Sequence, residues 1–528
     1  MLRLRLFTPI RLPSSRRHLF TTTSTKMASS SSRTYADALA RLSLLQSNRA
    51  VTSLFTADSS SSTKDLNALA IPEMLAWLAR AGYTPSSLYD SGIRVVHVAG
   101  TKGKGSVAAQ VASIIEKATG RKVGLYTSPH VVSVRERIRI NGVPVSREVF
   151  GRYFFEVWDR LSEVARREGM KEEDVDGAGG KPFYFRFLTI LGVHVFVSEG
   201  VKDVVLECGI GGEYDATNVV DENVVTAAVV TQLGLDHVGM LGDTVEKIAW
   251  NKAGVFKRGV KGFTRRLDGQ PGVMRVLRER AEEKGALLVE VGDEVVQAWE
   301  GVEGARLRGP FQKDNMALAV GAAREHLIRT GVEFEGEFGK EGTGYAELLA
   351  SMPDAFQVGL REASLRGRSE IFTDGDGVRW FLDGAHTDDS LAGVSKWFAQ
   401  QQAETDDVRV LLFNQQERDV ATLLGALLRP TEARFTHAIF TRNEETPAEP
   451  GSPRDMAVQN QAAETFRGAR PDTAVSVTDS VSSAVEQIKE IAVEAKKHGK
   501  GCVVLATGSF HLVGAVLRTI DHESDDLD

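Results

Sequence analysis

The sequence predicts an α/β protein with two domains, the first of them built around a mostly parallel sheet. Three observations support this prediction. The chain has 528 residues, which is long for a single domain. Short apolar runs rich in β-branched residues alternate with segments of helical periodicity. In the second half of the chain, each apolar run ends in glycine or polar residues, as strands of an α/β sheet do.

The composition is that of an ordinary globular protein, with 42% apolar and 26% charged residues. The net charge is only -7, and no long basic stretch lies outside the N-terminus, so nucleic acid is not an expected partner. No apolar run reaches the roughly 18–20 residues of a membrane span. The two cysteines, Cys208 and Cys502, are too few for a disulfide framework. We expect both to be buried in a protein of a reducing compartment.

The first 26 residues, "MLRLRLFTPIRLPSSRRHLFTTTSTK", differ from the rest of the chain. They contain several arginines and many serines and threonines, and the first acidic residue is Asp37. This composition is typical of a mitochondrial presequence. Met27 follows directly, and initiation there would give a protein without the basic segment. We therefore expect a mitochondrial form (in the matrix or associated with the inner membrane) and a cytoplasmic form; a merely disordered N-terminus is the alternative.

Residues 27–65 are expected to be a flexible segment with one amphipathic helix in "TYADALARLSLLQS". The serine run "DSSSSTKD" predicts a loop. A second helix is expected in "IPEMLAWLARAGY", started by Pro72 and stopped by Gly82.

The first domain is expected to span residues 66–308. Strands are predicted in "RVVHVAG", "KVGLYTSP", "VKDVVLECGIGG" and "ENVVTAAVVTQLGLDH". Helices are predicted in "SVAAQVASIIEKATG", "FLTILGVHVFVSEG" and "TVEKIAWNKAGVF". Because strands and helices alternate, the strands should lie parallel.

A second domain is expected over residues 309–520, followed by an acidic tail at 521–528. Its first helix is predicted to start at "QKDNMALAVGAAREHL". Strands are predicted in "VRWFLDGAH", "VRVLLFNQ", "THAIFT" and "GCVVLATGSF", and a loop in "RNEETPAEPGSPRD".

The stretch "GTKGKGS" lies between a predicted strand and a predicted helix. A glycine loop there lets backbone N–H groups approach phosphate oxygens, and the helix N-terminus adds positive charge. A lysine neutralises the phosphates, and a serine hydroxyl can bind Mg²⁺. Gly105 separates Lys104 from Ser106, unlike the common G-x-x-x-x-G-K-[ST] pattern. A glycine-rich turn without a ligand is the alternative. The expected phosphate-binding residues are Gly100, Thr101, Lys102, Gly103, Lys104, Gly105 and Ser106.

Two further residues follow predicted strands, where ligands bind in open α/β sheets. Glu207 ends the run "DVVLE", and its carboxylate could hold Mg²⁺ opposite the phosphates. His237 ends "TQLGLDH". Histidine is an unusual Mg²⁺ ligand, so a structural role is the alternative for His237.

Taken together, the motifs closely resemble the folylpolyglutamate/dihydrofolate synthase family of the Mur ligase superfamily. The resemblance runs from about residue 66 to 520, and the family's own loop pattern, GTxGKG[ST], accounts for Gly105. The motifs are "GTKGKGS", "TSPH", "RERIRING", "LECGIGGEYDATN", "LGLDHVGMLGDTVEKIAWNKAGVFK", "FLDGAHTDDS", "LLFNQQERD" and "ATGSFHLVG".

The resemblance implies a Mur-ligase-like fold, in which an N-terminal P-loop ATPase domain is followed by a smaller Rossmann-like C-terminal α/β domain. It implies an ATP-dependent ligase that joins L-glutamate to the γ-carboxylate of a reduced folate through an acyl phosphate. The implied cofactors are ATP and Mg²⁺, with K⁺ or another monovalent cation left open. The expected partners are these small molecules, and the chain is expected to be a monomer. Catalysis by positioning and charge neutralisation fits phosphoryl transfer.

Site residues follow from the resemblance by matching position. Ser106, Glu207 and His237 match metal ligands. Lys252, in "WNKAGVF", matches a lysine that is carbamylated in some relatives; a surface lysine at a helix end is the alternative. We expect Lys104, His237 and Lys252 to be catalytic. Residues expected to contact ATP are Asn315, Arg368 and Asp383.

Two further sets are expected at the other substrates. His386 and Ser509 match positions near glutamate, although a capping or structural role is the alternative. The folate is expected to lie near Ser128, His130, Arg137, Phe183 and Phe185. The two phenylalanines offer flat apolar faces to a pteridine, and the alternative is that both belong to the core.

The sequence departs from the family pattern at two places. Glu370 replaces a glutamine in "GRSE". In "FNQQERD", Asn414, Arg418 and Asp419 remain but the usual Thr-Gly pair is lost. These changes concern local loop geometry. Dihydrofolate synthase, with the same chemistry on dihydropteroate, and a nucleotide-binding protein without ligase activity are the alternative functions.

Overall fold

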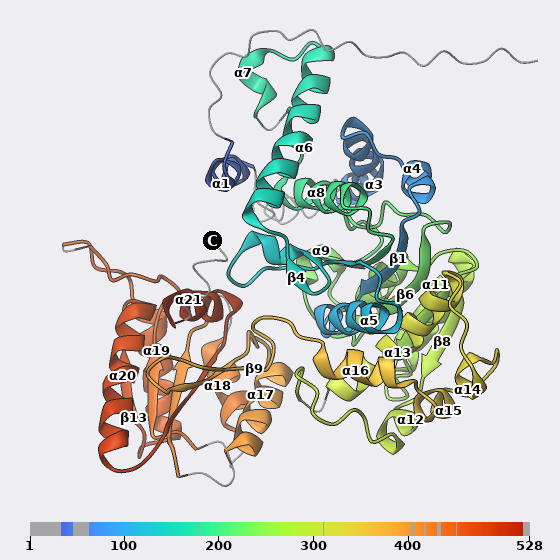
Figure 1. The fold of residues 1–528 in the computed structure, drawn as a ribbon. Helices are drawn as coiled ribbons and strands as arrows, with labels where there is room; N and C mark the ends of the chain where they lie inside the picture. The colour runs from blue at the N-terminus through green and yellow to red at the C-terminus, as the bar shows by residue number, and fades with distance from the viewer. Residues whose placement is uncertain are drawn as a thin grey trace, which may run out of the picture.

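The computed structural model describes residues 33–45, 63–177, 179–309, 311–402, 406–416, 419–429, 434–449 and 451–520. These residues form two α/β units, each with its own sheet (Figure 1). The expected presequence, the second start at Met27, Arg418 and the acidic tail lie outside the described residues. None of the helices in the described part is long and apolar enough to cross a membrane.

In the described part of the chain, helices α1, α3 and α4 (Pro85–Asp90) precede the first sheet. α1 (Tyr35–Ser43) begins at a capping box formed by Thr34 and Asp37, and it packs against α6 (Arg147–Arg167). α3 (Thr63–Arg80) starts earlier than expected, so Pro72 lies inside it rather than at its start. The expectation rested on the preference of proline for a first helical turn, which tertiary packing can override.

The first sheet has eight strands in the order β4-β3-β2-β5-β1-β6-β7-β8. The six strands from β2 to β8 in this order pair in parallel, and β3 and β4 add an antiparallel edge next to β2. The mostly parallel sheet is as expected. The strands are β1 (Arg94–Ala99), β2 (Val123–Tyr126), β3 (Ile138–Ile140), β4 (Val143–Pro144), β5 (Asp203–Glu207), β6 (Val225–Val230), β7 (Lys261–Arg265) and β8 (Leu287–Val291).

Helices cover both faces of this sheet, so its central strands are buried throughout. On one face, Val95 and Val204 pack with residues of α6 and α8 (Tyr184–Ser198). On the other face, Val96 and Val205 pack with α5 (Lys104–Thr119), α13 (Gln312–Arg329) and α16 (Asp354–Glu362). The remaining helices of this unit are α7 (Glu172–Val175), α9 (Val238–Leu241), α10 (Val245–Lys252), α11 (Pro271–Lys284), α12 (Asp293–Ala298), α14 (Gly336–Gly339) and α15 (Tyr345–Ala350), with 3₁₀ turns at Val134–Arg137 and Ala253–Val255.

The second unit has a six-stranded sheet in the order β13-β12-β11-β14-β10-β9, in which only β9 runs antiparallel. Its strands are β9 (Glu370–Thr373), β10 (Arg379–Leu382), β11 (Val408–Phe413), β12 (His437–Phe440), β13 (Ala474–Val477) and β14 (Cys502–Thr507). α17 (Asp388–Gln401), α18 (Val420–Leu428) and α19 (Ala457–Ala469) cover one face, and α20 (Val481–Lys497) and α21 (Phe510–Ile520) cover the other.

The chain passes from the first core to the second later than the boundary expected at residues 308/309. α13 and α16 pack directly on α5, and α13 also contacts β6 and β7. Residues such as Ala317 and Val320 lie in the same core as the first sheet. The second sheet begins only at Glu370. The division between the two cores therefore lies between Glu362 and Glu370. Both cysteines are free and buried, as expected.

Candidate functional site

The segment Gly100–Ser106, called the glycine loop below, joins the end of β1 to the first turn of α5. Its backbone depends on glycine at two positions. A Cβ at Gly100 would lie 1.8 Å from Oγ1 of Thr231, whose hydroxyl donates to the carbonyl oxygen of Lys102 at 2.6 Å. Gly103 has a φ of 84°, and a Cβ there would lie 2.4 Å from Oδ1 of Asn315. Neither position has room for a side chain.

The two lysines of the glycine loop have different partners. Nζ of Lys102 lies 3.0 Å from Oδ2 of Asp389, at the start of α17 in the second unit. Nζ of Lys104 donates to the carbonyl oxygen of Thr101 at 3.4 Å. No side chain caps the N-terminus of α5. The loop therefore combines a helix N-terminus, which carries partial positive charge, with an ammonium group folded back over it.

The Glu207 carboxylate is buried at the end of β5, beside the glycine loop. A Cβ at Gly105 would lie 3.4 Å from its Oε2, and the backbone N–H of Ser128 donates to the same oxygen at 2.9 Å. Burial raises the pKa of Glu207, while Lys104, the Ser128 N–H, Arg368 and Arg137 act to lower it. The carboxylate thus lies among positive groups from both units.

Ser106 is buried in the first turn of α5, and its hydroxyl accepts a hydrogen bond from Nε2 of Gln312 at 3.3 Å. Oε1 of Gln312 in turn accepts from Nδ2 of Asn315 at 3.0 Å. The start of α13 therefore lies against the glycine loop. Asn315 was expected near ATP, and it contacts this loop. Gln312 carries no signal in the sequence, because its contact with Ser106 arises only from the packing of α13 on α5.

His237 lies on an exposed turn with a φ of 49°. Its backbone N–H donates to Oδ1 of Asp236 at 3.0 Å, and its Nε2 lies 3.7 Å from Oδ2 of the same residue. Within the described residues, no group of three His, Cys, Asp or Glu side chains is close enough to hold a metal ion. Ser106 and Glu207 lie together at the first turn of α5, while the ring of His237 lies beside the carboxylate of Asp236.

Lys252 is buried, with 1% of its surface exposed, and its Nζ donates to the carbonyl oxygen of Gly100 at 2.7 Å. Burial lowers the pKa of Lys252 to about 7, and the positive charge of Lys104 contributes to the decrease. The alternative of a surface lysine is therefore wrong. A lysine that is partly neutral near pH 7 can act as a nucleophile or as a site of modification.

The second unit contributes Arg368 and Asp383. The carboxylate of Asp383 accepts from the backbone N–H groups of Ser369 and Ala385 at 2.8 and 2.9 Å. Burial raises the pKa of Asp383, and Arg368 acts to lower it. The guanidinium of Arg368 lies 4.1 Å from the centre of the Phe510 ring. Burial lowers the pKa of Arg368, whereas Asp383 and Glu207 act to raise it.

The two residues expected at glutamate lie close to Phe510. The ring of His386 is 5.9 Å from that of Phe510, and its Nδ1 lies 2.8 Å from the carbonyl oxygen of Gly384. The hydroxyl of Ser509 accepts from the backbone N–H of His511 at 3.1 Å. Both residues therefore lie near Phe510, whose ring contacts the guanidinium of Arg368.

Two of the residues expected near folate, Arg137 and His130, contact each other. Nε of Arg137 donates to Nδ1 of His130 at 2.9 Å, and its guanidinium lies 5.7 Å from the centre of the Tyr184 ring. Burial lowers the pKa of His130 to about 3, and Arg137 adds to the decrease. His130 is therefore neutral at physiological pH, and its Nδ1 is the acceptor.

The two phenylalanines differ in their environment. Phe185 is buried in the core, 6.1 Å from Tyr126 between ring centres, and a Cβ at Gly209 would lie 2.5 Å from its Cζ. The core alternative is correct for Phe185, because its ring is enclosed. Phe183 is half-buried, with the guanidinium of Arg186 at 5.7 Å from its ring.

Comparison with known proteins identifies the family. Residues 370–519 match the family described as the C-terminal domain of dihydrofolate synthetase. The chain is 37% identical over 510 residues to the folylpolyglutamate synthases of two Saccharomyces cerevisiae strains, FostersO and YJM789. The alignments cover 93% of this chain and 87% of the yeast proteins.

This chain belongs to the folylpolyglutamate synthase family. The solved structures support the same fold. Mycobacterium tuberculosis folylpolyglutamate synthase complexed with ADP is 23% identical, with a TM-score of 0.64, and the match covers 91% of this chain and 98% of that chain. Escherichia coli FolC in complex with DHPP and ADP is 25% identical, with a TM-score of 0.61 over 93% of this chain and 98% of that chain. The expected two-domain, Mur-ligase-like α/β fold is confirmed.

Residues at the two places where the sequence departs from the family pattern have local structural roles. Glu370 accepts from the backbone N–H of Gly367 at 2.7 Å and lies 3.4 Å from Nε of Arg366. Asn414 is bonded on both sides of its amide, to Asn443 at 2.7 Å and to Gln459 at 3.0 Å. Asp419 caps α18 through the backbone N–H of Ala421. Glu370 therefore fixes the loop that leads from Arg366 to Arg368.

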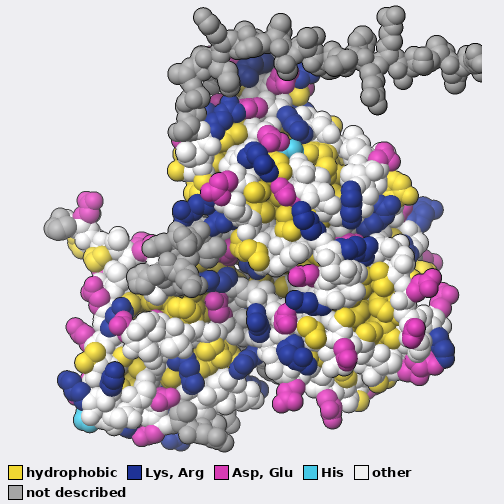
Figure 2. Space-filling model, viewed as in Figure 1, with side chains coloured by type: hydrophobic (Ala, Val, Ile, Leu, Met, Phe, Trp, Pro, Cys, Tyr) yellow, Lys and Arg dark blue, Asp and Glu magenta, His cyan; other side chains and the backbone are white. Residues whose placement is uncertain are grey.

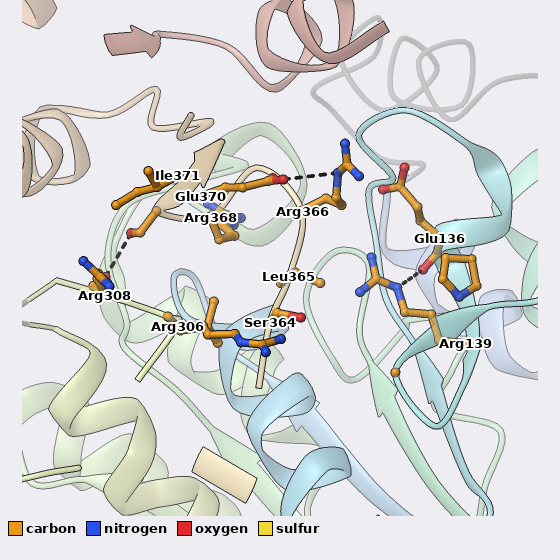
Figure 3. A pocket seen from close by; sticks show the side chains of 14 residues that line it. Glu136, Arg139, Arg306, Arg308, Ser364, Leu365, Arg366, Arg368, Glu370 and Ile371 are labelled. Carbon is orange, nitrogen blue, oxygen red and sulfur yellow. Dashed lines mark hydrogen bonds and ion pairs between the residues drawn. The ribbon is translucent and has the colours of Figure 1, made fainter. Parts of the chain in front are cut away.

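A cavity of about 480 Å³ lies at the junction of the two units in this family member (Figure 3). A smaller pocket of about 20 Å³, lined by Gly105, Ser128 and Glu207 among others, adjoins it. Apart from Arg368, which was expected near ATP, the arginines of the cavity carry no signal in the sequence, since they come from separate segments. The lining residues are Glu136, Arg139, Gly142, Pro144, Arg306, Leu307, Arg308, Ser364, Leu365, Arg366, Arg368, Ser369, Glu370 and Ile371.

Proposed function

We propose that this chain is an ATP-dependent ligase that adds L-glutamate to the γ-carboxylate of a tetrahydrofolate and so forms folylpolyglutamates. The observation that carries the proposal is the buried carboxylate of Glu207 against the first turn of α5, directly beside the glycine loop. The proposal is supported by relatives named folylpolyglutamate synthase that are 37% identical and align with 93% of this chain.

The reaction needs activation of a carboxylate, because a carboxylate is a poor electrophile for an amine. An oxygen of the folate γ-carboxylate attacks the terminal phosphorus of ATP, ADP leaves, and an acyl phosphate forms. The glutamate nitrogen then attacks the acyl carbon and loses a proton, and phosphate leaves the tetrahedral intermediate. The transferring phosphoryl group would lie at the N-terminus of α5, where backbone N–H groups and Lys104 neutralise its charge.

The residues at the first turn of α5 fit a magnesium ion in their chemistry. Ser106 and Glu207 offer a hydroxyl and a carboxylate oxygen, and Mg²⁺ prefers oxygen ligands together with phosphate oxygens and waters. When bound, the ion would neutralise charge on the transferring phosphoryl group. His237 remains a proposed ligand from the family resemblance alone.

Nucleotide and glutamate are proposed to lie between the two units. Asn315 lies on the glycine loop from the first unit, and Arg368 and Asp383 approach from the second. His386 and Ser509 lie close to Phe510, whose ring contacts Arg368. The folate is proposed to lie near Ser128, His130, Arg137 and Phe183, on the other side of Glu207.

The dihydrofolate synthase alternative is not favoured, although residues 370–519 match a family named for it. The test is a direct assay of the full chain with ATP, Mg²⁺ and labelled glutamate, with either tetrahydrofolate or dihydropteroate as the acceptor. Mass analysis should show products of tetrahydrofolate that are longer by successive glutamates, together with ADP. Incorporation with dihydropteroate and none with tetrahydrofolate would refute the proposal. ATP binding without any turnover would support the non-catalytic alternative.

The localisation expected from residues 1–26 and Met27 also remains a proposal. Fusing residues 1–40 to a fluorescent reporter should direct part of the reporter to mitochondria, and changing Met27 to leucine should remove the cytoplasmic part. A reporter that stays wholly in the cytoplasm would contradict the presequence.

A further inference from the structure

The cavity at the domain junction is lined by arginine side chains from both units (Figure 3). One wall is the hairpin of β3 and β4, which carries Arg139, and the opposite wall is the segment from Ser364 to Ile371. In Figure 2, lysine and arginine side chains also gather on the surface where the two units meet. The arginines that line the cavity are Arg139, Arg306, Arg308, Arg366 and Arg368.

The two carboxylates in the lining do not balance these charges. Glu136 accepts hydrogen bonds from the backbone N–H groups of Val131, Val132 and Ser133 at 2.8–2.9 Å, so it serves to hold its own loop. Glu370 is bonded to the N–H of Gly367 and pairs with Arg366. Five arginines thus face two carboxylates, and the cavity carries a net positive charge.

The guanidinium of Arg139, one of the positive charges in the cavity lining, is buried. It is only 5% exposed, and its Nε donates to the carbonyl oxygen of Glu136 at 3.0 Å. Strand alternation sends Ile138 into the core that contains α8, and so turns Arg139 toward the junction. Burial lowers the pKa of Arg139; Glu136 acts to raise it and the like charge of Arg366 to lower it further. A buried guanidinium in this setting is stabilised by an anion.

The cavity is continuous with the place where the reaction is proposed to occur. It shares Arg139, Leu365, Arg366 and Arg368 with the small pocket lined by Gly105, Ser128 and Glu207. Its volume of about 480 Å³ falls within the range of about 300–1,000 Å³ found for small-molecule sites. None of residues 100–106 of the glycine loop lines it, so the cavity lies beside this loop and not on it.

We infer that this cavity binds the α-carboxylates of the γ-linked glutamyl chain of the folate substrate. The inference rests on the proposed function, in which each cycle leaves one more carboxylate on the product. That product must return with its terminal γ-carboxylate beside Glu207. Planar guanidinium groups bind carboxylates through paired hydrogen bonds. Leu307, Leu365 and Ile371 provide apolar surface for the methylene groups between the carboxylates.

The test compares the full chain with its Arg306→Gln variant. Arg306 is exposed, so the substitution should leave the fold intact. In the variant, the ratio of the KM for a folate with five glutamates to the KM for a monoglutamate should be about tenfold higher than in the wild type. The reason is that one charged contact to the glutamyl chain is lost. Arg275→Gln, an exposed arginine on α11, is the matched control and should leave the ratio of the two KM values unchanged. Equal effects on both folates, or a raised KM for ATP or free L-glutamate instead, would overturn the inference.

A binding measurement separates this inference from the proposed function. A γ-linked pentaglutamate peptide without a pteridine is titrated into the full chain by calorimetry, in the absence of ATP. Binding should be about tenfold weaker in the Arg306→Gln variant. If the wild-type chain does not bind the peptide, the cavity inference fails even where ligase activity is present. If the peptide binds through Arg306 but no glutamate is ever incorporated, the proposed function fails and the anion site stands.

Discussion

The ammonium group of Lys252 and the carbonyl oxygen of Gly100 are joined by a hydrogen bond of 2.7 Å. The bond ties the end of α10 to the first residue of the glycine loop, far away in sequence. Because Lys252 is buried, its charge must be accommodated beside Lys104, and its pKa falls to about 7. The position of the glycine loop at Gly100 is therefore linked to the protonation state of Lys252.

Lys252 should make stability depend on pH. Its pKa is lowered from 10.5 in the unfolded chain to about 7 in the folded protein. Between these values the unfolded chain binds more protons, so the free energy of unfolding should rise with pH by up to about 1.4 kcal/mol per unit. Chemical denaturation between pH 7 and 9 should show this rise in the wild type and a smaller rise in Lys252→Met. Lys247→Met, on the exposed face of the same helix, should behave as the wild type. Identical pH dependence in all three would contradict the assignment.

Lys104 should be needed for turnover and not for folding. Its side chain lies over the glycine loop and is only half-buried, so removing it leaves the core untouched. We expect Lys104→Ala to lower kcat by about 10²–10³-fold, as the loss of a group that stabilises transition-state charge does. Thermal unfolding should be unchanged. Lys122→Ala, an exposed lysine at the start of β2, serves as the control. Retained ligase activity in Lys104→Ala would refute the phosphate role.

Glu207 should set the response to magnesium. Burial raises the pKa of its carboxyl group, so the charged form is costly in the folded protein without a cation. Glu207→Gln should therefore raise the melting temperature in the presence of a chelator. It should also raise the Mg²⁺ concentration for half-maximal activity at least about tenfold. Calorimetric scans with and without Mg²⁺ measure both effects. A variant that is stabilised by Mg²⁺ as strongly as the wild type would show that Glu207 is not a ligand.

Gly100 should not tolerate alanine. The added Cβ would lie 1.8 Å from the hydroxyl oxygen of Thr231, at a φ of 149°. The loop must then move, and we expect a loss of about 1–3 kcal/mol in the free energy of unfolding together with weaker ATP binding. Gly425→Ala on α18 is the control, since nothing lies within 4 Å of a Cβ there. A Gly100→Ala variant with unchanged ATP affinity would contradict the close packing.

Much of the fold could be predicted from the sequence, because the central strands are buried on both faces and form continuous apolar runs. The strands that were missed carry weaker signals. β7 includes charged residues at both ends, and β8 is only partly buried. The polar start of α13 resembles a linker in the sequence, although the later residues of this helix are buried all round.

Part of the candidate site could be predicted from the sequence, because some of its residues lie at the ends of the predicted strands. The glycine loop follows β1 directly, and Glu207 is the last residue of β5. Because parallel strands end at the same edge of a sheet, the sequence alone predicts that the two lie close together. Gln312 and the cavity arginines other than Arg368 could not be found in this way. Arg139, Arg306 and Arg366 meet only because separate segments of the chain fold against each other. Phe185 has an aromatic side chain suited to a ligand, but its location in the core is decided by tertiary packing.

The short stretch from Arg308 to Asn315 touches both halves of the molecule. At one end, the guanidinium of Arg308 binds the side chain of Gln401 at 2.9 Å, and its carbonyl oxygen accepts from the hydroxyl of Ser369 at 2.9 Å. At the other end, Gln312 and Asn315 rest on the glycine loop. This stretch therefore links the glycine loop to the second unit. A displacement of Gly103 or Ser106 when a phosphate binds the loop would change the orientation of the second unit.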